Sequence, residues 1–269
     1  MLIFVDMKIN TSLVLSTYNW PEALELVLKS IANQKTLPNE VLIADDGSQP
    51  NTKQLIDEVK KSFPIPIHHI WHEDQGNRKA IIMNKAIAQA NNDYIISIDG
   101  DVILHPTFIE DHLMMAEENV YLYGSRVNIQ KGALNTLFSS KNIRFNIFSK
   151  GIKKRGRTLR IPFLAKQQQK HPNYSSKMRG CNFSFWKSDF IKVNGYNEEF
   201  TGWGREDSEL VLRMHNAGIE AKRLKFGGIV YHIYHNEQSK SFLDRNDKIQ
   251  QNTIQNKLTF AEKGINQYM

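Results

Sequence analysis

Cysteine and long apolar runs are scarce in this sequence of 269 residues. Cys181 is the single cysteine, which excludes an intramolecular disulfide and a zinc site built on paired cysteines. The N-terminal apolar run LIFV has four residues and is followed by Asp6. A signal peptide needs a longer apolar stretch, and a membrane span needs about 20 residues. We therefore expect a cytoplasmic protein that is neither secreted nor membrane-spanning.

Acidic residues are absent between Lys131 and Lys177, although the whole chain has 28 acids against 35 lysines and arginines. Ten basic residues lie inside this segment, interleaved with apolar side chains such as Phe145 and Phe163. The formal net charge of +7 suits nucleic acid, an anionic membrane surface or a phosphorylated substrate. Two interpretations of the segment stay open. It is a solvated, partly mobile excursion, or it meets a phosphorylated acceptor or anionic lipid head groups at the inner face of the cell membrane.

Short apolar runs alternate with helical patterns over the first hundred residues. The apolar runs predict β-strands at 11–16, 41–44, 65–70 and 94–98. Apolar residues at helical spacing predict helices from Pro21, over 52–62 and over 79–90. This alternation is typical of βαβ units, so we predict an α/β fold with a mostly parallel central sheet flanked by helices. Later patterns predict strands at 179–186 and 228–234, helices at 187–193 and 208–217, and a helical tail at 237–269.

Polar residues follow each of these first strands. They lie at 16–19, 45–48, 75–78 and 99–101. In open parallel sheets, ligands bind at the carboxyl ends of the strands. The coincidence therefore predicts one shared site at that edge of the sheet.

The triplet Asp99-Gly100-Asp101 places two carboxylates around a glycine at a strand end. Glycine permits backbone conformations that other residues resist, so both carboxylates can turn toward one point. Paired hard oxygen ligands suit Mg²⁺ or Mn²⁺ bridging a diphosphate, and His232 and His235 could complete a Mn²⁺ shell. Taken singly, such a triplet is more often a solvated turn, and such a histidine pair is more often structural.

Asp46, Tyr18 and Arg78 suit a nucleotide. The Asp46 carboxylate can accept hydrogen bonds from the N3–H and ribose hydroxyls of a uridine. The Tyr18 ring can stack on a pyrimidine, and the Arg78 guanidinium can pair with phosphate. The structural alternatives are a turn carboxylate, a core tyrosine and a surface arginine.

The stretch GWGREDSE (202–209) sets Trp203 between two glycines and follows it with Glu206, Asp207 and Glu209. The glycines free the indole to lie as a platform under a sugar ring. The acids stand at a predicted helix start, where the helix dipole favours the ionised form. An ionised Asp207 beside a sugar hydroxyl is what general-base catalysis requires. The alternative is an acid-rich first helical turn with Trp203 as a core plug.

Together, these motifs resemble a known family. The ordered set STYN, ADDGS, GNRKAIIMNKAI, SIDGD, RGCNFSF, GWGREDSEL and VYHIYH is similar to the GT-A glycosyltransferases of inverting family 2, over residues 10–236. The C-terminal half resembles the catalytic region shared by β-1,4-galactosyltransferases and chondroitin-polymerase-like enzymes. The resemblance implies a GT-A fold, a UDP-sugar donor, Mn²⁺ or Mg²⁺, and inversion at the anomeric carbon. The transferred sugar would be galactose, glucose or an N-acetylhexosamine, and the acceptor a cell-surface glycan or lipid-linked glycan.

The resemblance also implies roles for the residues that match the family motifs. Ser208 departs from the pattern, because many relatives carry another acid at that place. The implied roles are uridine binding for Ser16, Tyr18 and Asp46; nucleotide binding for Arg78; ribose and metal binding for Asp99 with Gly100; metal ligation for Asp101 and His232, or His235; general base for Asp207; and acceptor binding for Glu206, Trp203 and Asn182.

We predict a nucleotide-sugar-binding half at 1–130, the basic excursion at 131–177, an acceptor-binding and catalytic half at 178–236, and a helical tail at 237–269. A sugar-nucleotide nucleotidyltransferase is the nearest rival, but it would show a glycine-rich basic loop after the first strand, and STYNWPEAL lacks one. A non-catalytic binder of nucleotides or anionic polymers is the other alternative. We expect no nucleic-acid partner.

Overall fold

The structure is a computed structural model of the whole chain, and it describes residues 9–172, 175, 178, 180–236 and 239–269. The α-helices are α1 (Pro21–Ala32), α2 (Pro50–Lys60), α3 (Lys79–Gln89), α4 (Phe108–Met115), α5 (Leu134–Ser140), α6 (Pro162–Lys166), α7 (Lys187–Lys192), α8 (Glu206–Asn216) and α9 (Leu243–Asn256). The 3₁₀ turns are η1 (Lys131–Ala133), η2 (Arg155–Thr158) and η3 (Ile265–Tyr268). The strands are β1 (Thr11–Thr17), β2 (Glu40–Asp45), β3 (Ile67–Trp71), β4 (Tyr94–Asp99), β5 (Val102–Leu104), β6 (Val120–Tyr123), β7 (Arg126–Ile129), β8 (Ile152–Lys153), β9 (Lys170–His171), β10 (Asn182–Trp186), β11 (Glu220–Arg223) and β12 (Val230–His232).

The central sheet has the strand order β3-β2-β1-β4-β10-β6-β11-β9. Strands β1 to β4 are mutually parallel, as predicted, whereas β10 runs antiparallel to both β4 and β6. The register pairs Ser16 with Asp99 and Thr17 with Asp45. The carboxyl ends of β1, β2 and β4 therefore meet at one edge, which is the edge where the sequence predicted a site.

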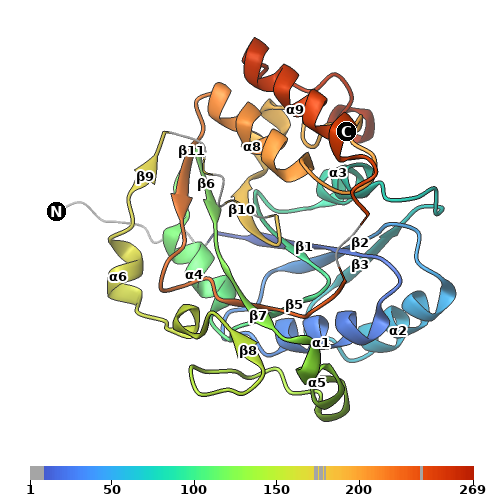
Figure 1. Cartoon of the computed structure of the whole chain (residues 1–269), viewed down its shortest axis with the longest axis vertical. Coiled ribbons are helices and arrows are strands. Elements are labelled where there is room, and N and C mark those ends of the chain that lie inside the picture. Colours follow the sequence, from blue (N-terminus) through green and yellow to red (C-terminus); the bar gives the residue numbers. More distant parts are fainter. Residues whose placement is uncertain (1–8, 173–174, 176–177, 179, 237–238) are drawn as a thin grey trace.

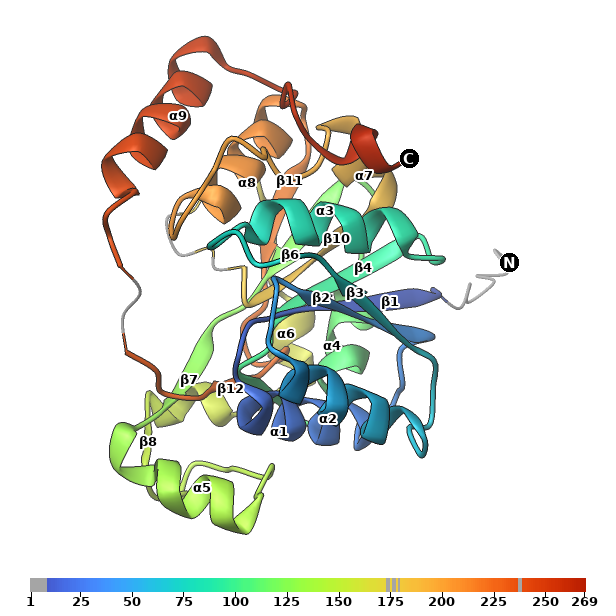
Figure 2. The ribbon, with the colours of Figure 1, turned by 90° about the vertical axis from the view of Figure 1, so that its right-hand side faces the viewer.

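Helices cover both faces of this sheet (Figure 1; Figure 2). Figure 2 shows α3, α7, α8 and α9 on one side and α1 and α2 on the other. Alternate strand residues point to opposite sides. Val14 packs with Ile82 and Met83 of α3, while Leu13 packs with Leu24 of α1. A sheet buried on both faces explains why these strands read as continuous apolar runs.

A second, smaller sheet has the order β5-β12-β7-β8 and was not predicted. Its strands are only two to four residues long, too short to give a clear sequence pattern. The predicted strand over 228–234 is reduced to β12, which pairs antiparallel with β5 and parallel with β7. This sheet brings His232 beside the carboxyl end of β4.

The basic excursion is packed in part against this second sheet. Leu137, Ile143 and Ile152 are buried with residues of β7, β12 and α1. Arg160 pairs with Glu110 and Asp111 of α4 at 2.9 and 2.7 Å. The interpretation of 131–177 as a merely solvated excursion is therefore wrong for these parts, because apolar contacts and ion pairs hold them to the body.

Other side chains of the excursion face solvent. Phe148 is 85% exposed and Phe163 is 71% exposed. Across the described residues, none of the helices combines the length and apolar character needed to cross a membrane.

Candidate active site

A cavity of about 430 Å³ opens at the carboxyl ends of β1, β2 and β4. The strand ends position most of its polar groups. It is lined by Ser16, Thr17, Tyr18, Trp20, Asp46, Asn77, Lys79, Asp99, Gly100, Asp101 and His235. The structure thus brings together seven of the residues that the sequence selected: Ser16, Tyr18, Asp46, Asp99, Gly100, Asp101 and His235.

The Asp46 carboxylate is fixed from two directions. Its Oδ1 lies 2.7 Å from His72 Nε2, and its Oδ2 accepts the Arg78 backbone N–H at 2.8 Å. Burial raises the pKa of Asp46, although the His72 contact and the Arg78 N–H act in the opposite direction. Tyr18 is half exposed at the rim, where its hydroxyl donates to Asp74 Oδ2 at 2.9 Å. Its ring is therefore free to contact a ligand, and the core-tyrosine alternative is wrong.

Lys79, the first residue of α3, lies between two carboxylates of the site. Its Nζ donates to Asp99 Oδ1 at 2.8 Å and lies 3.9 Å from Asp207 Oδ1. Burial alone would lower the pKa of the ammonium, but Asp207 and Asp99 outweigh burial and hold it well above its ordinary value. Asp99 also accepts from Ser16 Oγ at 3.1 Å. Lys79 therefore links the strand-end cavity to the start of α8.

Gly100 is required by close approach rather than by an unusual backbone angle. Its N–H donates to the Ser16 carbonyl at 2.7 Å, and a Cβ at this position would lie 2.6 Å from that same oxygen. Its φ is not among the positive values of the chain. The conformational reason that we expected for this glycine is thus replaced by a steric one.

Three side chains converge beside the cavity as a candidate metal site. The ligand atoms of Asp101, His232 and His235 all lie within 4.8 Å of one another. Asp101 Oδ2 is 3.4 Å from His232 Nε2 and 3.3 Å from His235 Nε2. The two histidines are thus placed about equally near the carboxylate, while Asp99 pairs with Lys79 instead.

The chemistry of this donor set fits a divalent cation. Asp101 Oδ1 is buried without a hydrogen-bond partner among the described residues. Burial raises the pKa of Asp101 to about 7, with the neighbouring Asp99 charge acting in the same direction, so a cation would relieve an unfavourable buried anion. Burial and the Arg126 charge lower the pKa of His232 to about 3, which keeps the imidazole in its neutral, ligating form. One carboxylate with two imidazoles favours Mn²⁺ over Mg²⁺.

Asp207, the second residue of α8, does not line the first cavity but lies 3.9 Å from Nζ of Lys79, which does. Its Oδ2 accepts the Gly180 N–H at 3.1 Å, and its Oδ1 accepts the Tyr196 hydroxyl at 3.3 Å. A Cβ at Gly180 would lie 2.2 Å from Asp207 Oδ2, so only glycine lets the backbone reach this carboxylate.

Glu206 lies beside Asp207 and has a different electrostatic environment. Burial, and then the Asp207 charge, raise the pKa of Glu206 to about 7. The Gly204 N–H donates to Glu206 Oε2 at 3.1 Å. Glu206 therefore holds a proton more readily near neutral pH than an ordinary glutamate does.

Trp203 is 44% exposed, so the core-plug alternative is wrong. Gly202, Gly204 and Arg205 around it have φ values of +70°, +107° and +80°. The loop needs these left-handed conformations to turn the indole outward, which explains the flanking glycines. Trp203 lines a second cavity, and so does Arg78, whose side chain is not among those lining the first.

Asn182, predicted to bind the acceptor, is fully buried in β10. Its Nδ2 donates to the Gly228 and Ser125 carbonyls at 2.7 and 3.2 Å, and its Oδ1 lies 3.1 Å from His112 Nε2. Other residues of the protein thus form hydrogen bonds with both the nitrogen and the oxygen of the amide, and the buried side chain has no surface for an acceptor. The residue joins the two sheets instead.

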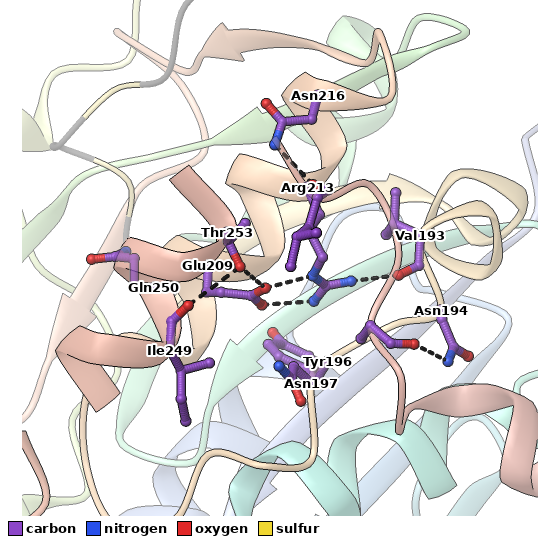
Figure 3. Close-up of polar contacts among 12 residues, drawn as sticks. Val193, Asn194, Tyr196, Asn197, Glu209, Arg213, Asn216, Ile249, Gln250 and Thr253 are labelled. Atoms are coloured by element: carbon purple, nitrogen blue, oxygen red, sulfur yellow. Dashed lines mark hydrogen bonds and ion pairs between the residues drawn. The ribbon is translucent and has the colours of Figure 1, made fainter. Parts of the chain in front are cut away.

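A buried ion pair on α8 connects this helix to the segment that precedes Tyr196 (Figure 3). Glu209 and Arg213 of α8 form two hydrogen bonds of 2.7 and 2.8 Å, and Thr253 of α9 donates to Glu209 at 2.9 Å. Arg213 also donates to the Val193 and Gly195 carbonyls, next to Tyr196. The pair therefore joins α8, α9 and the loop that carries the partner of Asp207.

Sequence reasoning missed Lys79, His72 and Tyr196. Lys79 follows Arg78 at a helix start, where a second basic residue reads as a solvated surface charge. His72 and Tyr196 carry no motif of their own, and their positions depend on contacts with residues 26 and 11 positions away. The signal that could have found Lys79 is its place inside the motif GNRKA, directly after a predicted strand-end loop.

Two family models match the chain. The model for glycosyl transferase family 2 matches residues 12–188, and the model for the N-terminal domain of galactosyltransferase matches residues 160–236. Together they cover the first cavity, the metal-ligand candidates and GWGRED, and they include the residues that line the second cavity except Ser239, Ser241 and Phe242. These matches favour a glycosyltransferase over a nucleotidyltransferase or a non-catalytic binder.

Curated relatives are similar in sequence to this chain. A chondroitin synthase from Escherichia coli is 26% identical over 242 residues, which is 82% of this chain and 34% of the relative. A validoxylamine A glucosyltransferase from Streptomyces hygroscopicus subsp. limoneus is 28% identical, over 77% of this chain and 48% of the relative. The chain thus spans about a third to a half of the length of these relatives.

Solved structures share the fold at low sequence identity. S. aureus TarS 1–349 has a TM-score of 0.61 at 14% identity, covering 97% of this chain and 68% of that one. The mannosyltransferase PcManGT from Pyrobaculum calidifontis, in complex with GDP-Man and Mn²⁺, has a TM-score of 0.57 at 16% identity, covering 83% and 56%. The first family model alone covers more than half of the 269 residues. The chain therefore belongs to glycosyl transferase family 2 and is a glycosyltransferase with the GT-A fold.

Proposed function

We propose that this enzyme transfers a hexose from a UDP-sugar to a hydroxyl of a glycan, with a divalent metal ion and with inversion at the anomeric carbon. The observation that carries the proposal is the position of Lys79. It bonds Asp99 at the strand-end cavity and lies 3.9 Å from Asp207 at the start of α8. Lys79 therefore places a candidate nucleotide site and a candidate base side by side, and sugar transfer from a nucleotide donor to an acceptor hydroxyl requires that proximity.

The donor would occupy the cavity at the ends of β1, β2 and β4. Asp46, fixed by His72 and the Arg78 N–H, would accept from the uracil, and the exposed Tyr18 ring would stack on it. Asp99 with Ser16 would face the ribose. A uridine donor is also supported by the similarity to TarS, one of whose structures is a complex with UDP.

Asp101, His232 and His235 would hold the metal ion, with Mn²⁺ favoured over Mg²⁺. When bound, the ion neutralises charge that develops on the departing diphosphate. The structural neighbour PcManGT supports this assignment, since its complex contains Mn²⁺. The neutral form of His232 and the unpartnered Asp101 Oδ1 support it from this chain's own residues.

Asp207 would act as the general base. The acceptor hydroxyl donates its proton to an Asp207 oxygen while its own oxygen forms a bond to the anomeric carbon. The bond from that carbon to the diphosphate oxygen breaks, and UDP leaves from the opposite face, which inverts the centre. Tyr196 and the Gly180 N–H keep the carboxylate in place, Glu206 would hold the acceptor, and Trp203 would stack on a sugar ring.

The acceptor would be a cell-surface or lipid-linked glycan, and the transferred sugar galactose, glucose or an N-acetylhexosamine. Relatives named chondroitin synthase and GalNAc(5)-diNAcBac-PP-undecaprenol beta-1,3-glucosyltransferase support this class. The exposed Phe148 and Phe163 in the acid-free segment 131–177 support a peripheral contact of this enzyme with anionic lipid.

The test is UDP release from a panel of UDP-sugars, with and without Mn²⁺, for the wild type, Asp101→Ala and Asp57→Ala. Asp57 is an exposed acid of α2 and serves as the matched control. We expect slow, metal-dependent hydrolysis of one donor, lost in Asp101→Ala and kept in Asp57→Ala. Hydrolysis of no UDP-sugar with any metal, or full activity in Asp101→Ala, would contradict the proposal.

A further inference from the structure

A second cavity, of about 240 Å³, lies next to the first and shares Asn77 with it. Its walls come from three separate parts of the chain: the loop 75–78 before α3, the loop 201–203 before α8, and residues 239, 241 and 242 before α9. Ligand pockets for drug-sized molecules have about 300–1,000 Å³. This smaller cavity suits a single sugar ring rather than a nucleotide.

Two aromatic side chains line this cavity from different segments. Trp203 and Phe242 are each 44% exposed, so both rings keep free apolar surface. A Cβ at Gly202 would lie 2.4 Å from the Phe242 ring, so the missing side chain lets the two segments touch. Asn246 of α9 holds them together by donating to the Thr201 and Gly204 carbonyls at 3.1 and 2.9 Å. The apolar walls are thus fixed in place.

Arg78 is the charged residue among the side chains that line the cavity. Its guanidinium donates to Gln75 Oε1 at 2.8 Å and to the Glu73 carbonyl at 2.6 Å. Both partners are neutral acceptors, and within the described residues Arg78 forms no ion pair. Its Nε is buried and without a hydrogen-bond partner there. Because Arg78 lines the cavity and its charge has no acidic partner among the described residues, the guanidinium can pair with a carboxylate or phosphate bound there.

We infer that this cavity binds an acceptor sugar that carries an anionic group, a carboxylate or a phosphate. The aromatic rings would contact the apolar face of the sugar, and Arg78 would pair with its charge. The place fits an acceptor, because the shared Asn77 joins the cavity to the donor site and the wall residue Trp203 lies in the same loop that leads to Asp207. The inference rests on the proposed transferase function and names the substrate class for it.

The experiment measures binding of three matched probes by calorimetry at low salt, in the presence of UDP and Mn²⁺. The probes are phenyl β-glucoside, phenyl β-glucuronide and phenyl β-glucoside 6-phosphate. We expect the wild type to bind at least one anionic probe about tenfold more tightly than the neutral one, as a charge-assisted hydrogen bond would give. The tighter of the two anionic probes identifies the group.

Variants locate the interaction. Arg78→Gln should lose the tenfold preference, whereas Lys60→Gln, on α2 and not among the lining residues, should keep it. Trp203→Ala and Phe242→Ala should weaken all three probes alike. A preference that persists in Arg78→Gln, or an absent preference in the wild type, would overturn the inference. So would a loss of UDP affinity in Arg78→Gln, which would assign the cation to the donor.

Binding of these probes needs no turnover, so the result is separate from the UDP-release test of the proposed function. A wild type that hydrolyses a UDP-sugar but shows no anion preference contradicts the substrate class alone. A wild type that hydrolyses none contradicts the transferase proposal itself.

Discussion

On the side of the site that we propose for the donor, Ser16 lies in β1, Asp99 ends β4 and Asp46 directly follows β2. On the side that we propose for the acceptor, Trp203 stands on a loop and Asp207 in the first turn of α8. The strands are fixed by ladders of backbone hydrogen bonds along β1, β2 and β4. The loop instead contains three residues with positive φ, Gly202, Gly204 and Arg205, and it is held by Asn246 of α9.

This difference shows which contacts make the donor side and the acceptor side rigid. A strand end is positioned by many backbone contacts, so one substitution nearby moves it little. The GWGRED loop and the first turn of α8 depend on a few side-chain contacts. Asn246 contacts Gly204, and Gln250 and Thr253 contact Ser208 and Glu209, from 42 to 44 residues further along the chain. We therefore expect substitutions far from the chemistry to affect the acceptor side more than the donor side.

The largest expected effect is a loss of sugar transfer without a loss of UDP binding. Asp207→Asn keeps the shape of the side chain but removes the base, so kcat for sugar transfer should fall by about 10²–10⁴-fold. UDP affinity should change little, because Asp207 is not among the residues that line the first cavity. Steady-state kinetics and calorimetry with UDP measure the two quantities.

Asp247→Asn is the matched control, since Asp247 lies on α9 and pairs with Arg205 of the same loop. It should keep most of the wild-type kcat. An Asp207→Asn variant that transfers sugar at more than about a tenth of the wild-type rate would exclude Asp207 as the base.

The second effect breaks the support of the acceptor side. Arg213→Met removes one partner of a fully buried ion pair and leaves the Glu209 carboxylate with Thr253 alone. Such a loss costs about 3–5 kcal/mol of folding free energy. Denaturant unfolding measures it, and Lys53→Met, which breaks an exposed pair with Asp57 at the same i,i+4 spacing, should leave stability essentially unchanged. Equal stabilities for the two variants would show that the buried pair does not support the fold.

The third prediction concerns the pH dependence of stability that Glu206, on the acceptor side, should cause. The Glu206 pKa is raised from 4.5 to about 7, chiefly by burial, so between these values the folded state holds a proton that the unfolded state has released. Wild-type stability should therefore fall as pH rises from 5 to 7, relative to Glu206→Gln, which has no such proton. Because Glu206 keeps partial solvent exposure, we expect about 2 kcal/mol. Thermal unfolding across this pH range gives the difference, and parallel curves for the two proteins would contradict the shift.

The donor side could largely be predicted from the sequence, and the physical reason is local. Apolar runs identify buried parallel strands, and polar residues at their ends must share an edge, so Asp46 and Asp99 were found without any structure. The observed ends of some elements differ from the predicted ones by a few residues. The helix predicted over 52–62 is α2 (Pro50–Lys60), and the strand predicted at 65–70 is β3 (Ile67–Trp71). The predicted domain boundaries stay a prediction.

The acceptor side could be predicted only in part, because its contacts join residues distant in sequence. Trp203 and Asp207 stood out by their local pattern, but nothing local showed that Phe242 would line the same cavity. Asn182 failed for the same reason: its partners are His112, Ser125 and Gly228, and only the three-dimensional fold brings them to it. Long-range side-chain contacts carry no period that a sequence pattern can reveal.

The smallest expected effect tests how firmly the donor side is built. His72→Phe removes the hydrogen bond behind Asp46 but leaves the Arg78 N–H contact, so Asp46 keeps one of its two supports. Loss of one buried hydrogen bond costs about 1 kcal/mol, so the Kd for UDP should rise by about five- to tenfold. His68→Phe is the matched control, because His68 lies at the other end of β3 and pairs with Glu40 at 3.3 Å. A rise of more than about a hundredfold in His72→Phe would mean that the donor side, like the acceptor side, depends on single side chains. Unchanged affinity in both variants would show that the backbone alone holds Asp46.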